Sequence, residues 1–155
     1  MNADDEWLKL DNQLCFRLYA ASRLVTKMYR PLLDALGLTY PQYLVMLALW
    51  QWEVEGDAAP KTVTRISERL LLDAGTLTPL LRRMEEAGFL TRERSGDGDG
   101  RELHVALTRA GRALKKKAAG VPQSLACTPG MPLGDIPALN ALLDRLIAAT
   151  QRLGR

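Results

Sequence analysis

The chain has few of the side chains that build disulfide frameworks or metal centres. Its 155 residues include two cysteines, Cys15 and Cys127, and one histidine, His104. The N-terminal stretch MNADDEW lacks the basic and apolar regions of a signal peptide, so we expect a cytoplasmic protein. In that compartment the thiols are expected to be free or redox-active rather than bridged for stability. A single histidine with no cluster of ligands around it argues against a metal site. We expect no cofactor.

Long hydrophobic runs are missing as well. No apolar stretch approaches the ~20 residues that a membrane-spanning helix needs. The content of 47% hydrophobic and 25% charged residues is that of a folded, soluble protein with an ample core. The length fits one domain, or one domain with an added oligomerisation element.

Positive charge is distributed unevenly along the chain. Residues 61–117 contain 13 Lys/Arg and 8 Asp/Glu, whereas the remaining residues contain 8 and 10. A basic central region favours a polyanionic partner, although a solvated basic surface would have the same composition.

The centre of this basic region, residues 62–108, has the pattern of a helix, a turn and a second helix, followed by a hairpin. Val63, Ile66 and Leu70 recur at helical spacing, and residues 72–76 interrupt that helix, with Asp73 or Thr76 able to cap the next one. The second helix is predicted to bury one stripe and expose another, and it should end at Gly88. The buried stripe comprises Leu77, Leu80, Leu81 and Met84, and the exposed set comprises Thr76, Thr78, Arg82 and Arg83.

Two alternating segments, 89–94 and 102–107, predict strands joined by the Gly/Asp-rich tip SGDGDGR. Helix, turn, helix and basic hairpin is the order of a winged helix-turn-helix, whose second helix enters a DNA major groove. We therefore expect a mainly α fold with a small β-wing. The winged helix-turn-helix would occupy residues 37–108, with helical dimerisation regions at 1–36 and 109–155, all within one compact domain.

The expected DNA contacts follow from side-chain length and charge. Short side chains at the start of the second helix suit base edges and thymine methyl groups, arginines suit phosphate or guanine, and a wing-tip arginine suits the minor groove. The residues expected near bases are Thr76, Thr78 and Pro79; those for phosphate or guanine are Arg82 and Arg83; those for phosphate are Arg92 and Arg94; and those that cap or position are Asp73 and the Gly75 backbone. At the wing tip Asp97 and Asp99 can orient Arg101, the arginine expected in the minor groove. Arg83 and Arg92 are equally compatible with solvated side chains.

The N-terminal segment is also predicted to be helical. Apolar residues in the pattern at 7–36 are too many for the surface helix of a monomer, so we expect burial against other helices, of the same or of a second subunit. Pro31 should kink or end this helix. A second apolar helix is predicted at 43–52, with Thr39 as its N-cap and Pro41 in its first turn.

Two more helices, separated by a break, are predicted after the hairpin. Thr108 can cap a basic helix at 109–119, and an amphipathic helix is expected at 136–153. Residues 120–134 between them are rich in Pro and Gly, and a break of this length is usually mobile or functional. The simplest architecture is a dimer whose terminal helices pack around a twofold axis. Its two winged elements would then lie about 34 Å apart and meet successive major grooves.

Three stretches of the sequence carry a family resemblance: LDNQLCFRLYAASR, LTYPQYLVMLALW and LLLDAGTLTPLLRRMEEAGFLTRERS. They closely resemble the organic hydroperoxide resistance regulators within the MarR family, over roughly the first two-thirds of the chain. The D-x-R of the wing tip, Asp99 and Arg101, by itself indicates only a MarR-like protein. The resemblance implies a homodimeric repressor of pseudo-palindromic operator DNA, released when an organic hydroperoxide oxidises its cysteine.

The resemblance also implies roles for four residues. Cys15 matches the peroxide-sensing cysteine, and Tyr29 and Tyr40 match the tyrosines that hydrogen-bond it. Cys127 looks like the second cysteine of the two-cysteine branch of the family, which forms a disulfide with the sensor of the other subunit.

Helix geometry constrains how Cys15 and Tyr29 can meet. Tyr29 follows Cys15 by 14 positions, so an intact helix places them on the same face but roughly 21 Å apart. Tyrosine hydroxyls that reach the sulfur must therefore come from an antiparallel partner helix. Such hydroxyls would favour the reactive thiolate form of Cys15. The neighbouring apolar side chains of Leu14, Phe16 and Leu18 would favour a hydrophobic organic hydroperoxide over hydrogen peroxide.

Three other interpretations stay open at this point. Cys15 can be an inert, buried side chain in a helix interface. A MarR-type repressor can instead be relieved by a reversible small aromatic ligand between the dimer helices and the DNA-binding lobe. A thiol peroxidase using Cys15 and Cys127 is less consistent with the sequence, because Arg17 and Arg23 are the only nearby candidates to polarise a peroxide, so we do not expect an enzyme.

Overall fold

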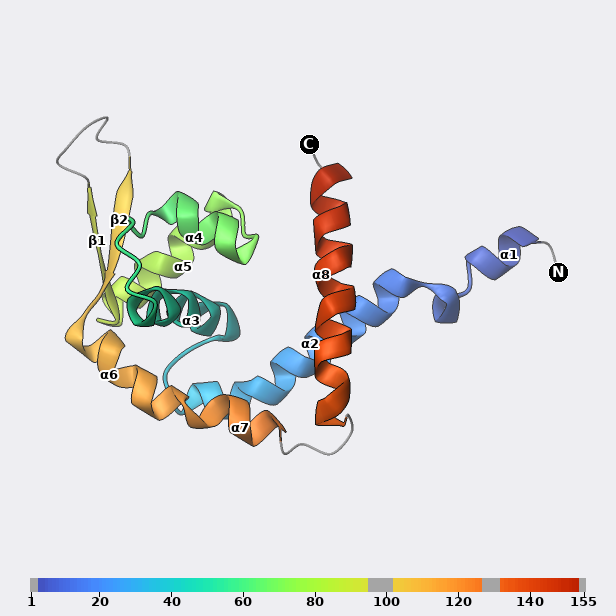
Figure 1. Cartoon of the computed structure of the whole chain (residues 1–155), viewed down its shortest axis with the longest axis horizontal. Coiled ribbons are helices and arrows are strands. Elements are labelled where there is room, and N and C mark those ends of the chain that lie inside the picture. Colours follow the sequence, from blue (N-terminus) through green and yellow to red (C-terminus); the bar gives the residue numbers. More distant parts are fainter. Residues whose placement is uncertain (1–2, 95–101, 127–131, 154–155) are drawn as a thin grey trace. The chain divides into compact units, whose positions relative to one another are not determined.

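The computed structural model describes residues 3–94, 102–126 and 132–153 (Figure 1). The chain forms two compact units, Met1–Val121 and Pro122–Arg155, and each is described by itself. Within the described segments, no helix combines the length and apolar character that a membrane crossing requires.

The N-terminal segment does not form the single helix predicted for residues 7–36. It contains a short helix α1 (Ala3–Trp7), a 3-10 turn η1 (Leu10–Asn12) and the long helix α2 (Leu14–Asp34). Side-chain amides cause the interruption: Asn12 Nδ2 donates to the Glu6 carbonyl at 2.8 Å, and Gln13 Nε2 donates to the Trp7 carbonyl. These carbonyls are thereby satisfied without a continuous helix, as polar side chains near helix ends commonly do.

Pro31 does not end α2 where the sequence allows for it. The helix continues through Pro31 to Asp34, one further turn. Because the proline lies so close to the C-terminus, the lost amide hydrogen removes a bond only from the last turn, where helices tighten or fray in any case.

The core of the first unit is built around helix α3 (Tyr40–Val54), which packs against α2, α4, α5 and α6. It begins at the predicted cap, where the Thr39 amide donates to Gln42 Oε1 at 2.8 Å in a capping box. It is longer than the predicted 43–52 and apolar on most sides, which is typical of a helix enclosed by others. Its buried residues are Tyr43, Val45, Met46, Ala48, Leu49, Trp50 and Trp52.

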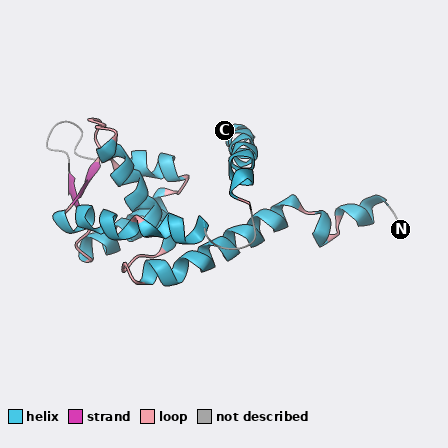
Figure 2. Ribbon diagram, turned by 60° about the horizontal axis from the view of Figure 1, so that its bottom comes forward, coloured by secondary structure: helices cyan, strands magenta, loops and turns pink. Residues whose placement is uncertain are grey.

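The predicted winged helix-turn-helix is confirmed. Helix α4 (Val63–Leu70) and helix α5 (Ala74–Glu86) are joined by a tight turn, and strands β1 (Leu90–Arg94) and β2 (Leu103–Leu107) form an antiparallel pair. This hairpin is the only sheet in the described part of the chain and stands out among helices in Figure 2. An isolated bridge between Thr62 and His104 ties β2 to the start of α4.

After the wing, helix α6 (Arg109–Ala118) begins at its predicted cap, where Thr108 Oγ1 accepts from the Gly111 amide at 3.0 Å. The break predicted at 120–134 is partly wrong, since Gly120–Ala126 forms helix α7. Pro122 lies in the first turn of α7, a position that a proline tolerates because its amide hydrogen would have no helical partner there.

The second unit contains a short 3-10 turn η2 (Leu133–Asp135) and helix α8 (Ile136–Leu153), close to the predicted 136–153. Helix α8 has no buried residue, and Leu139, Leu142 and Ile147 expose their apolar side chains.

Candidate functional site

The N-terminus of α5 is organised by Asp73. Its carboxylate accepts from the Thr76 amide at 2.9 Å and from the Thr76 hydroxyl at 2.7 Å. These bonds, the hydroxyl first, hold the pKa of Asp73 below its ordinary value. Asp73 is therefore the cap, and the Thr76 hydroxyl already donates within the chain.

The residues predicted to face DNA lie on the exposed side of α5. Gly75, Thr76, Thr78, Pro79, Arg82 and Arg83 are all exposed, while Leu77, Leu81 and Met84 are fully buried and Leu80 nearly so. Pro79 has no amide hydrogen, so the Gly75 carbonyl lacks the donor that residue i+4 usually supplies in a helix. One backbone acceptor near the helix start thus has no standard helical partner.

The arginines of this region differ in environment. Arg82 is 72% exposed and pairs with Glu86 one turn along α5 at 2.9 Å. Arg94 is exposed at the end of β1. Arg92, predicted to contact phosphate, is instead turned inward: only 18% of its side chain is exposed, and it binds Glu85. Asp99 and Arg101 lie outside the described residues.

A charged cluster that the sequence analysis did not identify fastens α4 to α3. Arg65 of α4 pairs with Asp57 and stacks over the Trp52 ring, with 4.3 Å between the guanidinium carbon and the ring centroid. Hydrogen bonds from Arg65 and the Ala59 amide, together with the charges of Arg65 and Lys61, lower the pKa of the Asp57 carboxyl. Asp57, Lys61 and Arg65 recur at four-residue spacing, but Asp57 and Lys61 lie in a polar loop and not on a helix, so the spacing does not predict the cluster.

Cys15 is the second residue of α2 and is exposed in the single chain. Its sulfur lies 4.0 Å from Gln13 Oε1. Successive turns of the same face carry Tyr19 and Arg23, whose guanidinium donates to the Tyr19 hydroxyl at 2.8 Å. Leu14 and Tyr19 are 58% and 59% exposed, so the thiol belongs to an apolar surface open to solvent.

Tyr29 and Tyr40 lie together at the other end of α2. Their ring centroids are 5.0 Å apart in an edge-on contact, and Tyr43 lies 6.0 Å from Tyr29. Burial, and for Tyr29 also the neighbouring Tyr40, raises the pKa of both hydroxyls. An ordinary tyrosine is protonated at neutral pH, and the raised pKa makes loss of the proton still less favourable, so both hydroxyls can donate hydrogen bonds.

The structure brings Tyr29 and Tyr40 together but does not bring them to Cys15 of the same chain. Helix α2 is continuous from residue 14 to residue 34. The 14-residue separation of Cys15 and Tyr29 therefore corresponds to roughly 21 Å along the axis. Cys127 lies outside the described residues.

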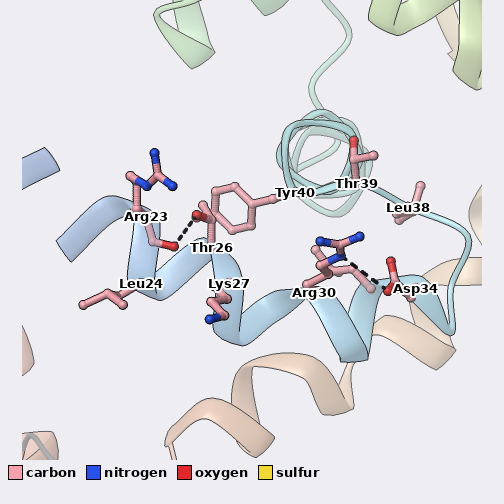
Figure 3. A pocket seen from close by; sticks show the side chains of 10 residues that line it. Arg23, Leu24, Thr26, Lys27, Arg30, Asp34, Leu38, Thr39 and Tyr40 are labelled. Carbon is pink, nitrogen blue, oxygen red and sulfur yellow. Dashed lines mark hydrogen bonds and ion pairs between the residues drawn. The ribbon is translucent and has the colours of Figure 1, made fainter. Parts of the chain in front are cut away.

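A cavity of about 750 Å³ lies between α2 and the start of α3 (Figure 3). In Figure 3 the Tyr40 ring projects toward Thr26, and the Arg30–Asp34 ion pair, 3.9 Å long, lies further along α2. Arg23, Lys27 and Arg30 give the lining a positive charge. Among the described residues, no three His, Cys, Asp or Glu side chains gather as a metal site would require.

Comparisons with known proteins agree with this architecture. The family model described as transcriptional regulator SarA/Rot matches residues 27–118. The organic hydroperoxide resistance transcriptional regulator of Bacillus subtilis is 46% identical over 140 residues, which cover 90% of this chain and 90% of that protein.

Solved structures of AbfR, a protein of Staphylococcus epidermidis, are similar over nearly the whole chain. Reduced AbfR bound to DNA aligns with a TM-score of 0.80 at 33% identity, covering 98% of this chain and 99% of that one. Disulfide-formed AbfR aligns with a TM-score of 0.62 at 36% identity, covering 93% and 96%. The chain therefore belongs to the MarR-type family of transcriptional regulators that includes the organic hydroperoxide resistance regulators.

Proposed function

We propose that this protein is a transcriptional repressor that binds operator DNA as a homodimer and releases it when an organic hydroperoxide oxidises Cys15. One observation carries the proposal: Tyr29 and Tyr40 form a pair in one chain, about 21 Å from the Cys15 of that chain. In an antiparallel dimer of α2 helices, the tyrosine pair of one subunit lies over the cysteine of the other. The exposed apolar side chains around Cys15 would then be covered by the partner.

The proposed chemistry uses the hydroxyls of Tyr29 and Tyr40 as hydrogen-bond donors. Hydrogen bonds from both hydroxyls to sulfur stabilise the thiolate, the form that attacks a peroxide. The thiolate forms a bond to the terminal peroxide oxygen as the O–O bond breaks, and the leaving alkoxide takes a proton and departs as an alcohol. Cys15 becomes a sulfenic acid, and the hydroperoxide is reduced.

The second step of the proposal joins Cys15 to Cys127 of the partner subunit. The Cys127 thiol attacks the sulfenic sulfur, a disulfide forms and water leaves. This needs Cα atoms within about 7 Å of each other. The similarity to disulfide-formed AbfR supports a bridge as the oxidised state.

DNA recognition is proposed for the exposed side of α5 and for the wing. Thr76, Thr78 and Pro79 would approach base edges in the major groove, with Arg82 and Arg83 one turn behind. Arg94 would contact phosphate, and Arg101 would enter the minor groove, oriented by Asp99. The similarity to DNA-bound AbfR supports this docking.

A mobility-shift titration of promoter DNA, before and after cumene hydroperoxide, tests the proposal. The wild type should lose its shifted band after oxidation, Cys15→Ser should keep it, and a reductant should restore wild-type binding. Non-reducing gels should show a covalent dimer that disappears in Cys127→Ser. Peroxide-induced release in Cys15→Ser would refute the cysteine as the sensor.

The cationic cavity beside Tyr40 favours one second candidate, a repressor relieved by a reversible small aromatic ligand. The positive lining from Arg23, Lys27 and Arg30 suits an aromatic carboxylate. Release of DNA by such a carboxylate in Cys15→Ser, without any peroxide, would establish this mode in place of oxidation.

A further inference from the structure

We propose that Glu85 and Arg92 are positioning residues for DNA binding, which fix the angle between the wing and α5 without contacting DNA themselves. The inference rests on the proposed docking of α5 and the wing on one DNA duplex. It assigns a shared role to two residues on different elements.

Glu85 holds the wing strand through both of its carboxylate oxygens. Oε2 accepts from Arg92 Nε at 2.9 Å and from Arg92 Nη2 at 2.7 Å, and Oε1 accepts from the Arg92 backbone amide at 2.9 Å. A fork of charge-assisted bonds combined with a backbone bond fixes direction as well as distance. One carboxylate therefore clamps both the side chain and the main chain of β1.

The clamp lies at the junction of the two elements that would meet DNA. Glu85 is in the last turn of α5, and Arg92 is the middle residue of β1, opposite Val105 of β2. Along β1 the side chains of Leu90 and Arg92 face the protein, whereas Thr91 and Glu93 are exposed. Strand alternation thus directs Arg92 toward the helix rather than toward a ligand.

The wing needs an external support. A two-stranded hairpin alone is marginally stable in water, and only residues 87–89 connect α5 to β1. Other supports are the buried side chains of Leu90, Val105 and Leu107 and two main-chain ties. The Phe89 amide donates to the Met84 carbonyl at 3.0 Å just before β1, and the Val105 amide donates to the Lys61 carbonyl at 2.8 Å on the β2 side. The Glu85–Arg92 clamp adds a side-chain link from the middle of β1 to α5 and so controls the tilt of the strand.

The exposure of Arg92 separates this role from that of a phosphate ligand. Only 18% of its side chain is exposed, against 72% for Arg82, and its charge is paired with Glu85. A phosphate would have to compete with a carboxylate that already binds the guanidinium with two hydrogen bonds.

Operator affinity measured across a range of salt concentrations tests the proposal, with Arg92→Ala, Arg92→Lys and Glu85→Gln as variants. We expect Arg92→Ala to weaken binding by about tenfold or more with little change in the log–log salt slope, since no phosphate contact is lost. Arg92→Lys should fail to restore affinity because an ammonium cannot reproduce the fork. Glu85→Gln should also weaken binding, by roughly threefold or more. The double variant with Glu85→Gln and Arg92→Ala should lose no more operator affinity than Arg92→Ala alone, because the two residues act as one unit.

Direct contact between Arg92 and a DNA phosphate predicts different results for the same variants. Arg92→Ala would then reduce the salt slope by about one, Arg92→Lys would restore binding, and Glu85→Gln would tighten binding by removing a negative charge near DNA. Any of these three results overturns the proposal. Glu86→Gln is the matched control, because Glu86 lies on the same helix but holds only the exposed Arg82, and we expect no loss of affinity there.

Two further measurements separate a folding defect, and a failure of the proposed DNA contacts, from a failure of the clamp. Melting curves identify any variant that fails to fold; if Arg92→Ala does, Glu85→Gln and Arg92→Lys decide the test. Arg101→Ala reports on the proposed docking itself: if it and Thr78→Val both retain full affinity, the proposed DNA contacts fail. If those two weaken binding while Arg92→Ala and Glu85→Gln do not, the clamp alone is contradicted.

Discussion

Gly111, at the start of α6, lies where three elements of the first unit meet. A Cβ atom there would lie 2.0 Å from the Phe89 carbonyl oxygen, far inside van der Waals contact. The Gly111 carbonyl accepts from the buried indole of Trp50 at 3.0 Å, so α6 is held between α3 and the start of the wing. The residue allows a close approach of backbones that no side chain would permit.

We therefore expect Gly111→Ala to lower the free energy of unfolding by about 1–3 kcal/mol or more, the usual cost of overpacking. Urea unfolding measures the change. Gly120→Ala is the control, since a Cβ there would meet nothing within 4 Å and should be nearly neutral. Equal effects of the two substitutions would contradict the packing argument.

Arg82 and Arg92 show that residue type alone does not reveal which partner an arginine binds. Both are arginines of the basic central region, and the sequence suggests nucleic-acid contacts for each. Only the three-dimensional pairing distinguishes them, because Glu85 and Arg92 lie on different elements and meet only after β1 folds back on α5. The sequence analysis places Arg92 at phosphate or in solvent, whereas the alternation of β1 in the structure turns it toward Glu85.

At the scale of elements, the loop between α3 and α4 depends on one carboxylate. Asp57 accepts from the Ala59 amide at 2.9 Å and pairs with Arg65, and these contacts lower its pKa from the ordinary value of 3.8. Because the folded pKa is depressed, this stabilisation is present above about pH 4 and is lost as the pH falls through the folded value.

Asp57→Asn should therefore be less stable than the wild type at pH 6, and the difference should shrink as the pH is lowered below about 4. Urea midpoints measured from pH 3 to pH 7 give the comparison. A difference that stays constant over this range would show that the charge of Asp57 has no part in it.

The element boundaries show how far the sequence predicts the fold. Thr39, Asp73 and Thr108 cap their helices as predicted, because capping depends on bonds two or three residues away and is a local property. The turn at 8–13 was missed, since the apolar pattern continues through it while the amides of Asn12 and Gln13 satisfy the carbonyls behind them. Gly and Pro at 120–134 predict a break, yet Gly120–Ala126 forms helix α7, because a proline in the first turn permits a helix.

The sequence likewise predicts some features of the proposed sensor and not others. The family motif gives Cys15, Tyr29 and Tyr40, and helix geometry gives their separation. Contact between Tyr29 and Tyr40 depends on how the turn at 35–39 returns α3 against α2, which no local pattern specifies.

At the scale of the whole molecule, the terminal helices expose several large apolar side chains of the kind that protein interfaces bury. Leu14, Tyr19 and Leu24 of α2 are more than half exposed, as is Leu142 of α8. Burial of such faces in a second copy would contribute about 25 cal/mol for each Å² removed from water.

Leu142→Glu should weaken the proposed dimer, because it places a charge on a face that the partner covers. Val54→Glu is the matched control: Val54 is 70% exposed and Leu142 60% exposed, but Val54 ends α3 rather than lying on a terminal helix. Sedimentation equilibrium should give a raised dissociation constant for Leu142→Glu only. Equal dissociation constants for the two variants would place the dimer contact elsewhere.

The most direct test of a sensor shared between subunits mixes two kinds of subunit, each lacking one part of the proposed sensor and both carrying Cys127→Ser. One carries Cys15→Ser with intact tyrosines, and the other carries Tyr29→Phe and Tyr40→Phe with Cys15 intact. In the mixed dimer the remaining Cys15 faces the intact tyrosines only if they belong to the partner. The rate of sulfenic acid formation with cumene hydroperoxide should then match that of the Cys127→Ser homodimer, whereas a rate as slow as that of the Tyr29→Phe, Tyr40→Phe homodimer would contradict the shared site.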